Sequence, residues 1–219
     1  MKTLILPLLG ISMLYSCKKK EQEVNPTISN EGLTTVSIIL THSQAPYEKD
    51  TATWEQLLDH NGRPLPVDTS KALLLLKANA SYTAELVLLD KTQVPYADAS
   101  QEIRERSNYH LFFYQPLPTD RSFVIPTSPG DILPLPIPSR ISTTKPIADT
   151  ATVLHLTVAL TDRDTNSPSY PIGLSSTFTT GAASNGWLRL VLRHQPNGKD
   201  GTYAPGSTDL DVGYTVKIQ

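Results

Sequence analysis

Short segments in which every second residue is apolar recur along this chain of 219 residues. The pattern is clearest in residues 152–161 and 210–218. A period of two places successive side chains on opposite faces of an extended strand, so each segment is expected to bury one face. Six further segments show the same alternation, a continuous apolar run or strand-favouring residues: 34–40, 72–76, 82–89, 109–114, 175–180 and 187–193. Eight such strands separated by turn residues predict an all-β fold, an antiparallel β-sandwich that is Ig-like or related.

One short helix is expected between these strands. Asp98 is suited to the N-cap, and Gln101 three residues later matches the spacing of a capping box. Glu102 and Arg106 follow at i, i+4, with the acid nearer the N-terminus, which is the more favourable order for an ion pair. The helix is expected to end near Ser107.

The beginning of the chain has the pattern of an export signal. Residues 4–14 form an apolar run after Lys2, and about eleven residues are too few to span a membrane, which needs roughly 20. Leu14, Ser16 and Cys17 resemble a bacterial lipobox, and Cys17 is the only cysteine. The resemblance implies cleavage before Cys17, diacylglycerol on its sulfur and an acyl chain on its new amino group. The alternative is an ordinary signal peptide followed by an incidental cysteine.

The remaining organisation follows from composition. Residues 1–16 are predicted to be a signal peptide, 17–29 a lipidated flexible tether, and 30–219 a single β-sandwich domain. Residues 115–146 contain eight of the 18 prolines and are predicted to be an insertion packed along that domain. The net charge of −2 gives no basic field, so nucleic acid is not an expected partner.

Several polar residues are candidates for a metal site. Asp162, Asp164 and Asn166 offer oxygen ligands at alternate positions, but the glycine and glutamate that complete a Ca²⁺ loop are missing, and a hairpin with Asx-turns explains them as well. His110 and His194 would converge if their strands were neighbours, with Asp209 or Asp211 as an orienting carboxylate. The metal candidates are therefore His110, His194, Asp162 and Asp164. Hydrogen-bonded structural histidines are the alternative.

No catalytic motif is evident. The chain lacks the Gly-x-Ser-x-Gly turn of a serine hydrolase, and Cys17 is assigned to lipid attachment. A non-enzymatic protein is therefore expected, with no cofactor beyond the acyl groups on Cys17. Trp54 and Trp187 are candidates for stacking on sugar rings, although a sandwich core uses aromatic residues as well.

Several segments together resemble a known group of proteins. They are residues 110–113 (His-Leu-Phe-Phe), 162–164 (Asp-Arg-Asp), 171–174 (Pro-Ile-Gly-Leu), 192–197 (Leu-Arg-His-Gln-Pro-Asn) and 208–211 (Thr-Asp-Leu-Asp). With the lipobox, they resemble small Gram-negative envelope lipoproteins often named "type 1 periplasmic binding fold superfamily". That name does not describe the expected fold, because the chain lacks strand–helix alternation.

This resemblance implies a lipid-anchored envelope protein that accompanies a TonB-dependent outer-membrane transporter. It brings no catalytic residues with it. The expected location is the outer membrane, and Lys18, Lys19 and Lys20 favour the periplasmic face, because surface-exported lipoproteins carry acidic residues there. The alternative function is direct binding of a glycan or a metal.

Overall fold

The computed structural model describes residues 33–63, 65–119 and 153–219. The predicted signal peptide, the tether with Cys17 and most of the proline-rich insertion lie outside the described residues. Among the residues that are described, no helix is both long and apolar enough to cross a membrane.

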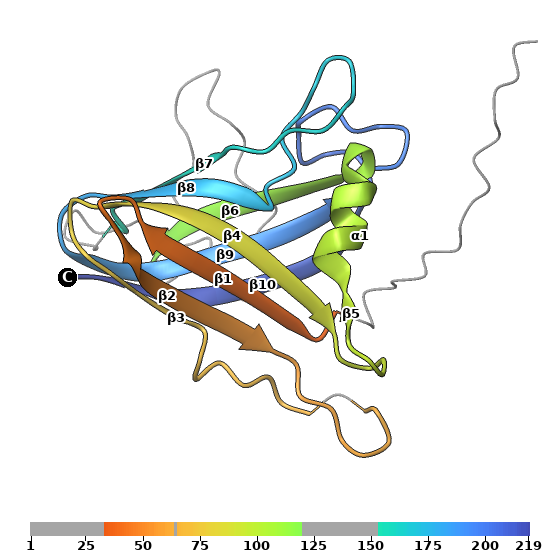
Figure 1. Cartoon of the computed structure of the whole chain (residues 1–219), viewed down its shortest axis with the longest axis horizontal. Coiled ribbons are helices and arrows are strands. Elements are labelled where there is room, and N and C mark those ends of the chain that lie inside the picture. The colour runs from red at the N-terminus through yellow and green to blue at the C-terminus, as the bar shows by residue number, and fades with distance from the viewer. Residues whose placement is uncertain (1–32, 64, 120–152) are drawn as a thin grey trace, which may run out of the picture.

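Two sheets stack face to face, which confirms the predicted all-β sandwich (Figure 1). The larger sheet has the order β2 (Ala45–Glu55), β1 (Thr35–His42), β4 (Ser81–Asp90), β8 (Ser175–Thr180) and β7 (Leu156–Leu160), with the short β5 (Ala97–Asp98) beside β4. The smaller sheet has the order β3 (Leu73–Leu76), β10 (Ser207–Ile218), β9 (Ser184–His194) and β6 (His110–Pro118). Neighbouring strands are antiparallel except β3 and β10, which pair in parallel.

The hydrophobic core consists largely of the apolar residues that occupy every second position in the predicted strands. In β1, Val36, Ile38 and Leu40 are fully buried, and they pair in register with Leu88, Leu86 and Ala84 of β4. From the opposite sheet, β9 buries Leu188, Leu190 and Leu192, and β10 buries every second residue from Leu210 to Ile218. Each buried side chain of this size stabilises the fold by roughly 1.5–3 kcal/mol.

One polar contact joins the two sheets through this core. Tyr214 of β10 is fully buried, and its hydroxyl donates a hydrogen bond to the Val36 carbonyl oxygen at 2.9 Å. A buried hydroxyl without a partner would be costly, so this bond fixes the stacking of β10 on β1.

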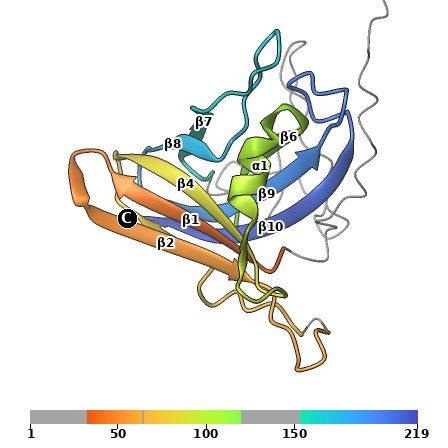
Figure 2. The ribbon, with the colours of Figure 1, turned by 45° about the vertical axis from the view of Figure 1, so that its right-hand side comes forward.

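Helix α1 (Ala99–Glu105) lies across one end of the sandwich (Figures 1 and 2). The predicted N-cap is confirmed, since Asp98 Oδ1 accepts from the Ser100 and Gln101 backbone N–H groups at 2.9 and 3.3 Å. The Gln101 side chain donates to Glu105 instead of completing a capping box. The predicted ion pair between Glu102 and Arg106 is present at 3.1 Å.

The start of the predicted insertion needs correction. Residues 115–118 belong to β6, paired with β9, rather than to a proline-rich loop. Because β6 is the edge strand of its sheet, Pro116 and Pro118 remove no hydrogen bond to a second neighbour.

Candidate functional site

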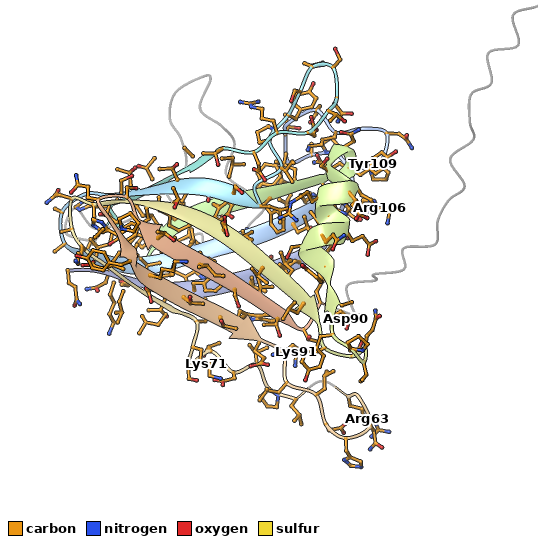
Figure 3. The ribbon with its side chains drawn as sticks, viewed as in Figure 1. Arg63, Lys71, Asp90, Lys91, Arg106 and Tyr109 are labelled. Atoms are coloured by element: carbon orange, nitrogen blue, oxygen red, sulfur yellow. The ribbon has the colours of Figure 1, made fainter. Side chains whose placement is uncertain are left out.

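Three segments that are distant in sequence meet at the end of the sandwich where α1 lies (Figures 1 and 2). They are the one-turn 3₁₀ helix η1 (Ser107–Tyr109), the loop of residues 161–174 and the loop of residues 195–206. Tyr109 lies at the corner where α1 leads into β6 (Figure 3). Most of the polar residues that the sequence analysis proposed as metal-site candidates lie in or beside these three segments.

His110 and His194 are direct neighbours, one on β6 and the other on β9. Their rings stack with centroids 4.9 Å apart and an angle of 15° between planes. The expectation that the two histidines converge if their strands pair is therefore confirmed. His110 is only 7% exposed, and its Nδ1 donates to the Arg106 carbonyl oxygen at 3.0 Å. This bond fixes the neutral tautomer and leaves Nε2 as an acceptor.

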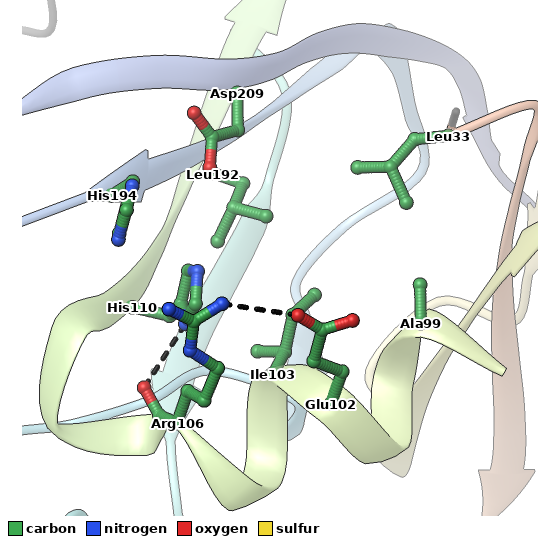
Figure 4. Close-up of a pocket in the computed structure, with 9 residues that line it drawn as sticks. All are labelled: Leu33, Ala99, Glu102, Ile103, Arg106, His110, Leu192, His194 and Asp209. Atoms are coloured by element: carbon green, nitrogen blue, oxygen red, sulfur yellow. Dashed lines mark hydrogen bonds and ion pairs between the residues drawn. The ribbon is translucent and has the colours of Figure 1, made fainter. Parts of the chain in front are cut away.

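The histidines line a small cavity beneath α1 (Figure 4). Its volume of about 30 Å³ has room for one or two water molecules but not for a larger ligand. Burial lowers the pKa of His110 to about 4; the hydrogen bond to the Arg106 carbonyl oxygen opposes this shift only in part, and the charges of the nearby His194, Arg106 and Lys199 add to the lowering. Burial also raises the pKa of Asp209, which lines the same cavity. His110 is therefore neutral at neutral pH and acts as a packed, hydrogen-bonded core residue.

The stacked geometry does not favour a metal ion between the two histidines. An imidazole nitrogen binds zinc in the plane of its ring, at roughly 2.0–2.1 Å. Because the two ring planes are nearly parallel, no single nearby point lies in both of them. Within residues 33–63, 65–119 and 153–219, no three His, Cys, Asp or Glu side chains are grouped so that they could hold a metal ion.

Asp162, the third metal candidate, has a different role in the structure. Its Oδ1 accepts from the Gly173 backbone N–H at 2.8 Å, and its Oδ2 accepts from the backbone N–H groups of Leu174 and Ser175 at 2.9 and 3.1 Å. Three backbone donors occupy this carboxylate, which ties the start of the 161–174 loop to its end.

Asp164, the fourth metal candidate, forms a buried ion pair with Lys199. The Lys199 Nζ and Asp164 Oδ2 atoms are 2.8 Å apart, and the two side chains are 1% and 0% exposed. Burial alone would raise the pKa of Asp164, but Lys199 and the Tyr170 backbone N–H outweigh it and hold that pKa below its ordinary value. Burial lowers the pKa of Lys199 in spite of this partner. Asp164 also accepts from the Asn166 backbone N–H at 3.2 Å, in the Asx-turn that the sequence suggested.

Lys199 of this ion pair also lines a larger polar groove, which the sequence did not predict. Its volume of about 390 Å³ falls in the range of small-molecule sites, about 300–1,000 Å³. The three segments contribute its lining: Asn108, Tyr109, Asn166, Ser167, Pro168, Tyr170, Asn197, Gly198 and Lys199. Lys199 is buried, Asn108 and Tyr170 are half-buried, and Asn197 is exposed at the rim.

The two tryptophans lie in neither cavity. Trp54 is on β2 of the larger sheet and packs against the hydrophobic core. Trp187 is on β9 of the smaller sheet, where its indole ring covers Gly213 so closely that a Cβ there would clash. Asp211, the other candidate carboxylate, is bound by Arg189 at 2.8 and 2.6 Å. The structure therefore gives these residues packing and pairing roles.

No protein-family model, no curated protein and no solved structure matches this chain. Fold and site together define an all-β sandwich that carries a polar groove built from three loop segments at one end.

Proposed function

We propose that this chain is a lipid-anchored, non-enzymatic protein of the outer membrane that binds a partner or ligand through the groove beside α1. The groove is the observation that carries the binding function. Its three segments are held together by hydrogen bonds between residues far apart in sequence, such as Thr165 N–H to Asn108 Oδ1 at 3.0 Å and Lys199 Nζ to the Ser107 carbonyl oxygen at 2.9 Å. A surface that is organised before binding loses little conformational entropy when a ligand binds.

The anchor is supported by the sequence. Leu14, Ser16 and Cys17 have the lipobox pattern, and a lone cysteine in an exported protein needs a role other than a disulfide. Two or three acyl chains are enough for stable attachment, since each buried methylene contributes about 0.8 kcal/mol. Residues 17–29 would then hold the domain away from the lipid headgroups.

The proposed partner is a TonB-dependent outer-membrane transporter, for which this chain would be an accessory subunit on the periplasmic face. The support is the resemblance to small envelope lipoproteins and the three lysines that follow Cys17. The predicted tether would suit such a role, because a flexible linker would let the groove reach a neighbouring membrane protein.

Two measurements test this proposal. Cys17→Ser should abolish labelling by a palmitate analogue and move the protein from the membrane pellet to the soluble fraction. Affinity purification from detergent-solubilised native membranes should recover an outer-membrane barrel protein with the wild-type chain. A Cys17→Ser variant that stays labelled and membrane-bound would contradict the anchor, and repeated purifications without a barrel protein would contradict the partner.

A further inference from the structure

The groove presents amide groups whose orientation is fixed by their neighbours. The Asn108 Oδ1 atom accepts from both the backbone N–H and the hydroxyl of Thr165, each at 3.0 Å, so its Nδ2 group must point the other way. The Asn166 Nδ2 group donates to the Asn108 carbonyl oxygen at 3.2 Å and to Asp164 Oδ2 at 2.9 Å, which leaves its Oδ1 as an acceptor. Both residues line the groove, so these contacts leave a donor on one lining amide and an acceptor on the other.

The groove carries almost no net charge. Lys199 is the only lining residue with a charged side chain, and this side chain is 1% exposed and paired with Asp164. Its Nζ also donates to the Ser107 carbonyl oxygen at 2.9 Å. An anionic ligand would therefore gain little attraction from Lys199, because its charge is buried and paired with Asp164. An uncharged ligand needs no such attraction and would not be repelled.

Ring surfaces complete the lining. Tyr109, Pro168 and Tyr170 contribute rings, and the Tyr170 ring packs against the backbone of Gly201. Gly201 has a φ of +82°, and a Cβ at this position would come within 2.9 Å of the Tyr170 ring. The close approach of the 195–206 loop thus holds this ring in place. Tyrosine and proline rings offer apolar faces, which suit a ligand that presents C–H surface.

We propose that the groove binds a neutral carbohydrate. Sugar hydroxyls are both donors and acceptors, so they match the donor of Asn108 and the acceptor of Asn166, while the C–H face of a pyranose ring matches the tyrosine and proline rings. The volume of about 390 Å³ suits a short oligosaccharide segment rather than a single ion. This inference rests on the proposed binding function and names its ligand class.

The test uses the full-length lipidated protein in detergent micelles and a panel of neutral oligosaccharides derived from glucans, xylans and mannans. An acidic oligogalacturonate and an unstructured neutral peptide serve as comparison ligands. Binding is measured by isothermal titration calorimetry up to millimolar ligand. At least one neutral oligosaccharide should bind, and the comparison ligands should not.

Two variants locate the binding in the groove. Asn108→Asp keeps the oxygen that accepts from Thr165 but removes the donor, and Asn197→Gly removes a rim amide where the φ of 58° suits glycine. Each should weaken binding about tenfold or more. The matched control is Asn185→Asp, an exposed position on β9 outside the groove, which should leave the dissociation constant unchanged. Unchanged melting temperatures would show that all three variants fold.

The carbohydrate proposal is overturned if no neutral oligosaccharide binds, if the oligogalacturonate or the peptide binds instead, or if both groove variants bind as the wild type does. The outcome for the wider function is separate. In one outcome, no carbohydrate binds, but the affinity purification recovers a membrane protein with the wild type and not with Asn197→Gly. The groove then binds that protein, and only the proposed ligand class is wrong. If Asn197→Gly also leaves the recovered proteins unchanged, the groove has neither role.

Discussion

Acidification should destabilise this protein through His110. His110 is 7% exposed, and burial lowers its pKa from 6.5 to about 4 in the folded state. Because the folded value lies below the unfolded value, the unfolded chain takes up the proton first as the pH falls. The stabilisation from neutral His110 is therefore fully present above about pH 6.5 and is lost progressively as the pH falls toward 4.

The size of the effect follows from the two pKa values. A difference of one pKa unit corresponds to about 1.4 kcal/mol, so the fall from 6.5 to about 4 sets an upper limit of roughly 3.5 kcal/mol. Between pH 7.5 and pH 5 the expected loss in the free energy of unfolding is about 2 kcal/mol. This is a large share of the total for a domain that is stabilised by roughly 5–15 kcal/mol.

The surroundings explain why the charged ring is not accommodated. Burial is the main cause, and His194, Arg106 and Lys199 add repulsion. Two carboxylates line the cavity, but Glu102 is already paired with Arg106, and burial raises the pKa of Asp209. Protonated His110 would thus have at most one or two water molecules in this cavity, with one lining carboxylate already paired and the charged form of the other disfavoured by burial.

Urea unfolding followed by tryptophan fluorescence measures the effect at several values between pH 5 and pH 7.5. In His110→Gln the amide can still donate to the Arg106 carbonyl oxygen, so the fold should persist while the titrating group is gone. This variant should lose about 2 kcal/mol less than the wild type over the same range. His60→Gln, at an exposed position, should behave as the wild type does. If His110→Gln shows the same pH dependence as the wild type, the assignment to His110 is refuted.

Two further substitutions test the structural roles assigned above. Asp164→Asn leaves the Lys199 charge buried without its partner, so it should lower the free energy of unfolding by roughly 3–5 kcal/mol, and a loss below about 1 kcal/mol would contradict the role of the pair. Asp98→Ala removes the side-chain acceptor that caps α1 and should cost about 1 kcal/mol by the same urea assay, while Asp98→Ser should restore most of it.

Most of the fold could be predicted because its strongest signals are local. The period of two in β10 selects Val212, Tyr214 and Val216, and all three are buried. The first half of β2 carries no such signal, because it lies at a sheet edge where side chains such as Tyr47 face solvent. Pro116 and Pro118 led to the wrong prediction that residues 115–118 begin a loop. Prolines are tolerated in β6 only because it is an edge strand, and the sequence does not show which strands lie at an edge.

The candidate site could also be predicted only in part. The alternation in the sequence placed His110 and His194 on two strands, and the two residues became neighbours once these strands were found to pair. The groove gave no comparable signal. Its contacts join Asn108 to Thr165, 57 residues apart, and Lys199 to Ser107, 92 residues apart. Asparagine and tyrosine in loops are too common for their sequence positions alone to indicate that they meet.

The buried ion pair links the stability of this end of the molecule to its binding function. Lys199 binds the Ser107 carbonyl oxygen, and Asp164 accepts from the Tyr170 backbone N–H, so the pair joins all three segments of the groove. A buried ion pair is a weak source of stability, because desolvation offsets the attraction between the charges. In this structure the ion pair mainly holds Asn166 and Tyr170 in position relative to η1. Loss of Asp164 should therefore impair both stability and binding, whereas Asn197→Gly should impair binding alone.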